Sequence, residues 1–429
     1  MRIAMLASGT RGDVQPMVAI GDELARRGHE VVVAVNSDLA DWVTRAGLRA
    51  VPTGVDFKRF LNSAESRRML AHGKVDTTIR RIVADEHRVN QQIVNACVRA
   101  AENADVILTT VTMSLRGLCL EKATGVPSRI LYSFPILPTG DFSGIMPRVR
   151  DFRMAWANRG GSRLLNQLYW MRNKANLDEM SDLMGAPRVS RMPRQEERPG
   201  LHLYSPRVVP EPSDLPGGHE LIGFPVLSDG LRDRLGERTV PAELDRWLDA
   251  GPEPVYFGFG SMPVLDPERT LRELIDVTAR RGIRGLVGAG WSELGRYADG
   301  LPDHLFLARS EFDHDRVLPR CRAAVHHGGA GTTAAALRAG LPSVVASFFA
   351  DQPFWGWRTE QLRVGTALPF RGLTPARLGR ALDRVLDPAY RTRARAVGAD
   401  LRREDPASRA GDVIEQWLSP RRPQVKGIS

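Results

Sequence analysis

The chain has few cysteines and hardly any lysine. Its three cysteines, Cys97, Cys119 and Cys321, are scattered over 429 residues and form no CxxC pair, which excludes a disulfide framework and disfavours structural metal. Scattered thiols are typical of a reducing compartment, so we expect a cytoplasmic protein. Only five of the 60 basic residues are lysines, and the arginines that dominate the net charge of +10 are spread along the chain. Because no nucleic-acid-binding motif accompanies them, we expect no nucleic-acid partner.

Long apolar runs are also lacking. The longest ones stop before the roughly 18 residues that a membrane span needs, and the first one reaches glycine and charge too early for a signal peptide. Between Arg148 and Lys174 seven basic residues face one acid, Asp151. This excess raises the hypothesis of an anionic acceptor or a membrane surface, but a solvated basic helix is the simpler interpretation, and we do not expect membrane association.

Strand-like and helix-like segments alternate in both halves of the chain. The first half contains strand patterns at 2–7, 29–35 and 104–110, and the second half contains them at 254–261 and 323–329. The alternation predicts an α/β protein with two doubly wound, Rossmann-like domains that face a central cleft. We place the domains at 1–210 and 230–402, with a linker at 211–229. We expect a C-terminal helix and tail, 403–429, to pack back on the first domain. Residues 136–200 break the rhythm and suggest an inserted helical or loop region.

The stretch SGTRGDVQP, residues 8–16, lies between the first strand and the first helix. It lacks the GxGxxG fingerprint, and Asn36 ends the second strand where an NAD site would have an acid, so a dehydrogenase is not predicted. Asp13 has two interpretations. It is either a capping residue of the following helix or a general base that faces the cleft.

Two stretches of the second half carry polar groups to the ends of strands. HHGGAGTT, residues 326–333, follows a strand and opens a helix, where small residues and backbone N–H groups suit a phosphate. FADQPFW, residues 349–355, places Asp351 and Gln352 at the next junction. These two side chains either hydrogen-bond vicinal hydroxyls of a sugar or cap the helix.

Four blocks together resemble the family 1 glycosyltransferases of the GT-B fold, specifically the bacterial natural-product and sterol-type enzymes. The blocks are GTRGDVQP, FGFGSM (257–262), LPRCRAAVHHGGAGTTAAALRAGLP (318–342) and FFADQPFWGWR (348–358). The resemblance covers most of the chain. It implies an N-terminal acceptor-binding domain and a C-terminal nucleotide-sugar-binding domain. It also implies an inverting, metal-independent transfer from a UDP- or dTDP-sugar to a hydroxyl of a lipophilic small molecule, with no cofactor besides that nucleoside diphosphate sugar.

The resemblance assigns roles residue by residue. Asp13 corresponds to the base that accepts the acceptor's proton. The positions that correspond to donor contacts are Ser261, Trp291, Phe312, His327, Gly329, Gly331, Thr332, Asp351 and Gln352. The candidates for the acceptor site, each of which equally fits a core position, are Phe57, Phe60, Met69, Phe134, Ile136, Phe142, Met146 and Trp156.

The loop expected to meet the nucleobase departs from its relatives. It reads FDHDRVL, with Asp313 in place of a proline and Arg316 in place of a tryptophan, so the choice between UDP and dTDP stays open. Its DHD triplet, 313–315, matches a DxD metal motif in form, but we expect no metal. The alternatives are a non-catalytic nucleotide-binding partner protein of the same fold, and an epimerase or phosphorylase. The acceptor, the sugar and the oligomeric state cannot be read from the sequence.

Overall fold

The computed structural model describes most of the chain. The described residues are 1–63, 65–66, 69, 75–144, 154–192, 194–258, 260, 266–288, 290, 297 and 300–419. In this part of the chain, all of the strand pairs within the two sheets are parallel.

The first sheet has seven strands in the order β3-β2-β1-β4-β5-β6-β7. Its strands are β1 (Arg2–Ala7), β2 (Glu30–Val35), β3 (Arg49–Pro52), β4 (Val106–Thr110), β5 (Ser128–Tyr132), β6 (Gly200–His202) and β7 (His219–Leu221). Its helices are α1 (Arg11–Arg26), α2 (Ser37–Arg45), α3 (Phe57–Asn62), α5 (Val75–Arg88), α6 (Asn90–Ala101), α7 (Ser114–Thr124) and α8 (Ala155–Leu183). The central strand β1 is buried on both faces because its run IAMLA is wholly apolar.

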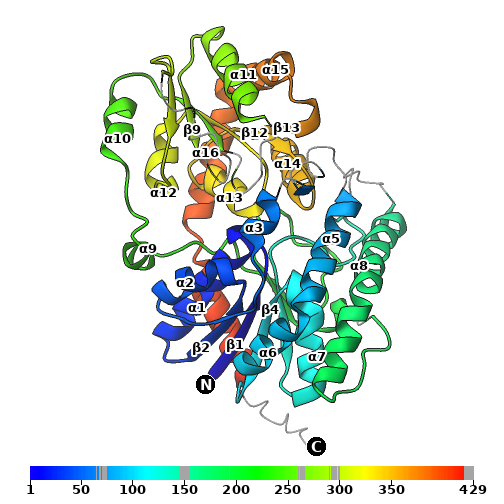
Figure 1. Cartoon of the computed structure of the whole chain (residues 1–429). Coiled ribbons are helices and arrows are strands. Elements are labelled where there is room, and N and C mark those ends of the chain that lie inside the picture. The colour runs from blue at the N-terminus through cyan, green and yellow to red at the C-terminus, as the bar shows by residue number, and fades with distance from the viewer. Residues whose placement is uncertain are drawn as a thin grey trace, which may run out of the picture.

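The second sheet has six strands in the order β10-β9-β8-β11-β12-β13. Its strands are β8 (Val255–Gly258), β9 (Gly285–Gly288), β10 (Leu305–Ala308), β11 (Ala323–His326), β12 (Ser343–Ser347) and β13 (Gly365–Pro369). Its helices are α10 (Ala242–Asp249), α11 (Pro267–Ala279), α12 (His314–Val317), α13 (Ala330–Arg338), α14 (Gln352–Gln361), α15 (Pro375–Val385) and α16 (Pro388–Arg402). The two sheets with their helices form the lower and upper halves of Figure 1, and the prediction of two doubly wound domains is confirmed.

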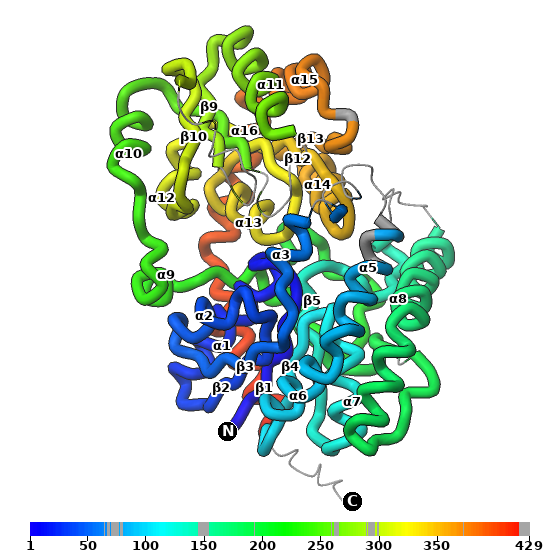
Figure 2. Tube along the Cα trace, in the orientation of Figure 1, coloured from blue at the N-terminus to red at the C-terminus, as the bar shows by residue number. Residues whose placement is uncertain are grey.

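Two helices from the second half of the chain pack against the first sheet. α9 (Asp229–Leu235) and α17 (Pro406–Leu418) both contribute apolar side chains to the hydrophobic cluster around β1 and α1. α17 comes from the far end of the chain and is drawn red among the blue elements in Figure 2. Because Leu231 and Leu235 are buried in that cluster, α9 packs with the first sheet although most of its residues lie beyond the predicted boundary at residue 230. The domain boundaries themselves stay predictions.

Candidate active site

The loop after β1 turns Asp13 back onto the start of its own helix. Thr10 is the N-cap of α1, and its backbone N and its Oγ1 donate to Asp13 Oδ2 over 2.9 and 3.2 Å. The side chain of Asp13 therefore does cap the start of α1. Burial among the surrounding groups raises the pKa of Asp13 to about 6, against the hydrogen bonds from Thr10. A carboxylate with that pKa is a stronger base than an ordinary surface aspartate, so capping and base catalysis are compatible roles.

Gly9 and Asn36 fix the shape of this loop. Gly9 has φ +138°, and a Cβ there would overlap the Asp13 carboxylate. Asn36 is fully buried at the end of β2, where its Oδ1 accepts from Gly9 N over 3.2 Å and its Nδ2 donates to Gly9 O over 3.1 Å. In the sequence, Asn36 served only as an argument against an NAD-binding site. The missed signal is a polar side chain at the carboxyl end of the strand next to β1.

The two adjacent histidines after β11 have different surroundings. His326 is fully buried, and its Nδ1 accepts from Gly328 N over 3.1 Å, so it shapes the turn. The His327 ring lies between Gly260 and Gly329, where added Cβ atoms would come within 2.7 and 2.6 Å of the imidazole. Burial lowers the pKa of His327 to about 4, opposed weakly by the Gly258 backbone. A neutral His327 would therefore meet a ligand as a hydrogen-bonding group, not as a cation.

The first turn of α13 is open beside His327. Gly329 is the N-cap, Gly331 is exposed with open space where a Cβ would lie, and Thr332 is half-buried. Backbone N–H groups at such a helix start attract anions. This arrangement can receive a phosphate group.

The loop after β12 brings a second carboxylate to the same site. Asp351 is the N-cap of α14, and Trp355 Nε1 donates to its Oδ2 over 2.7 Å. Burial raises the pKa of Asp351 to about 7, and the nearby charge of Asp13 adds to that rise. The charge of Asp13 therefore acts on Asp351, so the two carboxylates, one from each half of the chain, lie within electrostatic range of each other. The buried Gln352 lies beside them, and its Oε1 accepts from Phe348 N over 2.7 Å.

Phe312 packs the loop that we expect to meet the nucleobase against neighbouring aromatic rings. Phe312 is buried against Tyr256 and His314, with ring centroids 6.1 and 5.1 Å apart. Arg232 contacts both acids of the DHD triplet, at 3.5 Å from Asp313 and 2.8 Å from Asp315. In the described part of the chain, no three metal-ligating side chains gather into a cluster.

The predicted acceptor residues divide into partly exposed and buried ones. Phe57 and Phe60 pair on α3 with centroids 6.2 Å apart, and Phe134 and Ile136 are half-buried. Met69 and Phe142 are buried, and the Phe142 ring contacts Phe354 of α14 with centroids 5.9 Å apart. Trp156 is exposed on α8. Three predicted site residues lie outside the described residues: Met146, Ser261 and Trp291.

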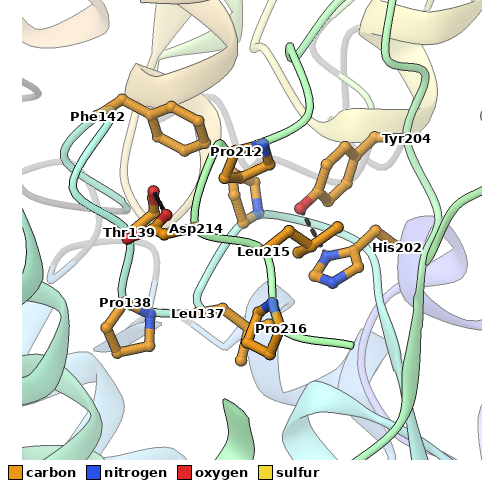
Figure 3. Close-up of a pocket in the computed structure, with 11 residues that line it drawn as sticks. Leu137, Pro138, Thr139, Phe142, His202, Tyr204, Pro212, Asp214, Leu215 and Pro216 are labelled. Atoms are coloured by element: carbon orange, nitrogen blue, oxygen red, sulfur yellow. Dashed lines mark hydrogen bonds between the residues drawn. The ribbon is translucent and has the colours of Figure 1, made fainter. Parts of the chain in front are cut away.

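A narrow pocket lies beside the predicted linker (Figure 3), and neither Asp13 nor Asp351 is among the residues that line it. Its lining consists of loop 135–142, segment 212–216 and two residues from the end of β6 and just beyond it, His202 and Tyr204. Asp214 ties the two segments together by accepting from Thr139 Oγ1 over 2.5 Å and from Gly140 N over 2.9 Å. Of the predicted site residues, this pocket includes only Phe142.

No helix of the described residues combines the length and the apolar character that a bilayer crossing requires.

Comparisons with known proteins match both halves of the chain. A family model described as the glycosyltransferase family 28 N-terminal domain matches residues 3–101, and one described as the erythromycin biosynthesis protein CIII-like C-terminal domain matches residues 301–415. The sterol 3-beta-glucosyltransferase UGT80B1 of Arabidopsis thaliana is 30% identical over 100% of this chain and 70% of its own length. For UGT80A2 of the same plant, also 30% identical, the match covers 94% of this chain but only 64% of the relative. An uncharacterized glycosyltransferase of Mycobacterium leprae is 30% identical over 98% and 97% of the two chains.

Solved structures share the fold. The glycosyltransferase of kitacinnamycin superimposes with a TM-score of 0.70 and 21% identity over 97% of this chain and 99% of its own. The glycosyltransferase VinC, in complex with dTDP, has a TM-score of 0.65 and 18% identity over 97% and 99% of the chains. The GT-B fold predicted from the sequence is therefore confirmed.

Proposed function

The chain belongs to the family 1 glycosyltransferases of the GT-B fold, and on that basis we propose that it transfers a sugar from a nucleoside diphosphate to a hydroxyl group of a lipophilic small molecule. We propose UDP or dTDP as the nucleotide. VinC and the SsfS6 glycosyltransferase of Streptomyces sp. SF2575 have been solved with thymidine diphosphates, and the plant relatives are named as sterol glucosyltransferases, which supports this choice.

One observation carries the proposal: Asp13 and Asp351, from loops after strands of different sheets, are both buried within electrostatic range of each other, and their pKa values are raised to about 6 and about 7. A base for an alcohol and a group that holds sugar hydroxyls are the two carboxylate functions that such a transfer needs. The open first turn of α13, with the neutral His327 beside it, supports the proposed place of the diphosphate.

We propose a single displacement with inversion. The acceptor oxygen forms a bond to the anomeric carbon while the bond from that carbon to the diphosphate oxygen breaks. The hydroxyl proton goes to Asp13, and the electron pair leaves with the diphosphate. The N–H groups at the start of α13 and His327 stabilise the leaving charge. Metal independence is supported by Arg232, which forms ion pairs with both acids of the DHD triplet.

The remaining site assignments are proposals of the same kind. Gln352 would share the donor sugar with Asp351, and the loop at Phe312 would meet the nucleobase. The half-buried Phe57, Phe134 and Ile136 suit the acceptor better than the buried Met69 and Phe142. We also propose a cytoplasmic location, which the three free and buried cysteines support.

A donor and acceptor screen tests the proposal. Pure protein is incubated with UDP- and dTDP-sugars and a mixed panel of sterols, macrolides, polyketides and flavonoids, and adducts are read by mass spectrometry with and without EDTA. We expect a hexose or deoxyhexose adduct that survives EDTA and forms about 10²- to 10⁴-fold more slowly in Asp13→Asn. An adduct lost with EDTA would contradict metal independence. Nucleotide binding without any adduct would favour the non-catalytic alternative.

A further inference from the structure

Arg11 links the first turn of α1 to the second half of the chain. Its Nη2 lies 2.5 Å from Glu237 Oε2, in the segment that follows α9, and its Nη1 lies 3.2 Å from Glu311 Oε2, next to Phe312. The two contacts span 226 and 300 residues of sequence. Arg11 is two residues from Asp13, so the residue that makes these contacts belongs to the same helical turn as the proposed base.

The guanidinium has further partners on its own side. Its Nε donates to Gln15 Oε1 over 3.0 Å, and its carbon lies 5.0 Å from the centre of the buried Trp42 ring. Trp42 Nε1 donates to Glu237 Oε1 over 2.7 Å. Both oxygens of Glu237 are therefore used, one by each neighbour. Because the Glu237 side chain is only 17% exposed, whereas that of Glu311 is 78% exposed, we expect Glu237 to be the stronger partner of Arg11. We call Arg11, Trp42, Glu237 and Glu311 the Arg11 cluster.

The proposed nucleobase loop is anchored to the same segment as Glu237. Asp313 N donates to Thr239 O over 3.0 Å, and Arg316 Nη1 donates to Arg238 O over 3.3 Å. Arg11 also acts on the loop directly, since its charge contributes to the lowered pKa of His314, although burial is the main cause. Segment 237–239, loop 311–316 and the first turn of α1 are therefore joined through one side chain.

We infer that Arg11 is a positioning residue that couples the nucleobase loop to Asp13. A bound nucleotide then holds Asp13, the proposed general base, in place. The inference rests on the proposed function. A ligand that orders loop 311–316 also orders Glu311 and Glu237, which hold Arg11 and the turn that carries Asp13. Coupling of this kind is reciprocal, so loosening Arg11 must also weaken the affinity for the nucleotide.

The test separates this role from a merely structural one. We expect Arg11→Gln to weaken UDP or dTDP binding, measured by calorimetry, and to lower kcat, each by about 5- to 100-fold. Arg11→Lys restores part of both, because it keeps the charge but loses the forked geometry. The control is Arg26→Gln, on the same helix, whose partner Glu23 is local and whose side chain is 63% exposed. It leaves both quantities unchanged.

A double-mutant cycle identifies the partner. Glu237→Gln should reproduce the effect of Arg11→Gln, and the double variant should be no worse than either single one. Additive losses, or a fall in melting temperature with unchanged nucleotide affinity and kcat, would overturn the inference. If the wild-type protein binds nucleotide but transfers no sugar, the proposed function fails, and the nucleotide affinity of Arg11→Gln against Arg26→Gln still decides the coupling.

Discussion

The two carboxylate oxygens of Asp13 have different surroundings. Both hydrogen bonds from Thr10 go to Oδ2, which leaves Oδ1 as the oxygen that we expect to receive the proton. The sequence left helix capping and base catalysis as alternatives, and the geometry accommodates both. The pattern around Asp13 could be read from the sequence because the glycine, the threonine and the acid all lie within residues 9–13. Asp351 was also singled out in the sequence, but the effect of Asp13 on its pKa could not be foreseen, since it arises from the packing of the two halves of the chain.

Replacement of Asp13 by Asn should remove the base and keep the loop. We expect Asp13→Asn to lower kcat by about 10²- to 10⁴-fold, the range for loss of a general base. An amide oxygen can still accept from Thr10, so nucleotide affinity measured by calorimetry should stay close to that of the wild type. Full turnover in this variant would rule out Asp13 as the base.

The raised pKa of Asp13 also predicts how stability depends on pH. Because the folded pKa is about 6, above the usual value of 3.8, the folded state keeps a proton between pH 4 and 6 that the unfolded state has lost. Stability from this group therefore falls as pH rises from 4 to 6 and stays low above 6. Relative to the wild type, Asp13→Asn should gain melting temperature between pH 4.5 and pH 8. A difference that does not change with pH would contradict this prediction.

Activity should fall on the acid side with an apparent pKa near 6 to 7, belonging to the interacting pair Asp13 and Asp351. The pH profile of kcat/KM measures this limb, and a flat profile between pH 5 and 8 would argue against both assignments.

Trp355 holds Asp351 through its indole N–H, a role that the sequence did not reveal because tryptophan in an apolar run looks like core. Trp355→Phe keeps the ring but removes the donor that lowers the pKa of Asp351. We expect the KM for the nucleotide sugar to rise by about 10-fold, the cost of one hydrogen bond to a charged group. The acid limb of the pH–activity profile should move to higher pH. Trp357→Phe, on the same helix, is the control. Equal effects in both variants would mean that only packing was lost.

At the scale of elements, α1 offers two glycines with positive φ for comparison. Gly9 precedes the helix and lies against Asp13, whereas Gly28 follows the helix with φ +87° and open space around it. We expect Gly28→Ala to cost about 1 kcal/mol of stability and to leave the activity unchanged. Gly9→Ala should carry a similar backbone cost and abolish turnover, because the new methyl group displaces the carboxylate. Urea denaturation and initial rates measure the two effects, and an active Gly9→Ala variant would contradict the proposed loop geometry.

α8 is an element that the sequence predicted only loosely, as an inserted helical or loop region. Its hydrophobic period is hidden because the buried face carries asparagines, among them Asn158, Asn166 and Asn173. Asn158 Nδ2 donates to Gly140 O over 2.9 Å, and Asn166 Nδ2 donates to Ile136 O over 3.3 Å. These amides hold backbone of the preceding loop. Their partners are set by tertiary packing, so the sequence left a helix and a loop as alternatives for this insert. The alternation of apolar strands with helices in the two doubly wound domains was predicted correctly.

At the scale of the whole molecule, Arg27 joins α1 to α17. Its guanidinium donates to Asp412 Oδ1 over 2.8 Å, to Glu415 Oε2 over 3.0 Å and to Ser408 O over 2.8 Å. We expect Arg27→Ala to reduce the free energy of unfolding by about 1–3 kcal/mol, because charged and backbone groups lose a shared donor. Arg26→Ala, its exposed neighbour, should cost less than about 1 kcal/mol. Equal urea midpoints for the two variants would show that α17 does not depend on this contact.

The packing of α17 on α1 has a consequence for the order in which the protein is made. Arg27 and Asp412 are separated by 385 residues, so a ribosome that has finished the first sheet must still translate the whole second sheet before α17 emerges. At about 5–20 residues per second, an apolar face of the nascent first half stays uncovered for roughly 10–40 seconds. The N-terminal half therefore cannot complete its folding during its own synthesis, and its yield in a cell should depend on chaperones that shield that face until translation ends.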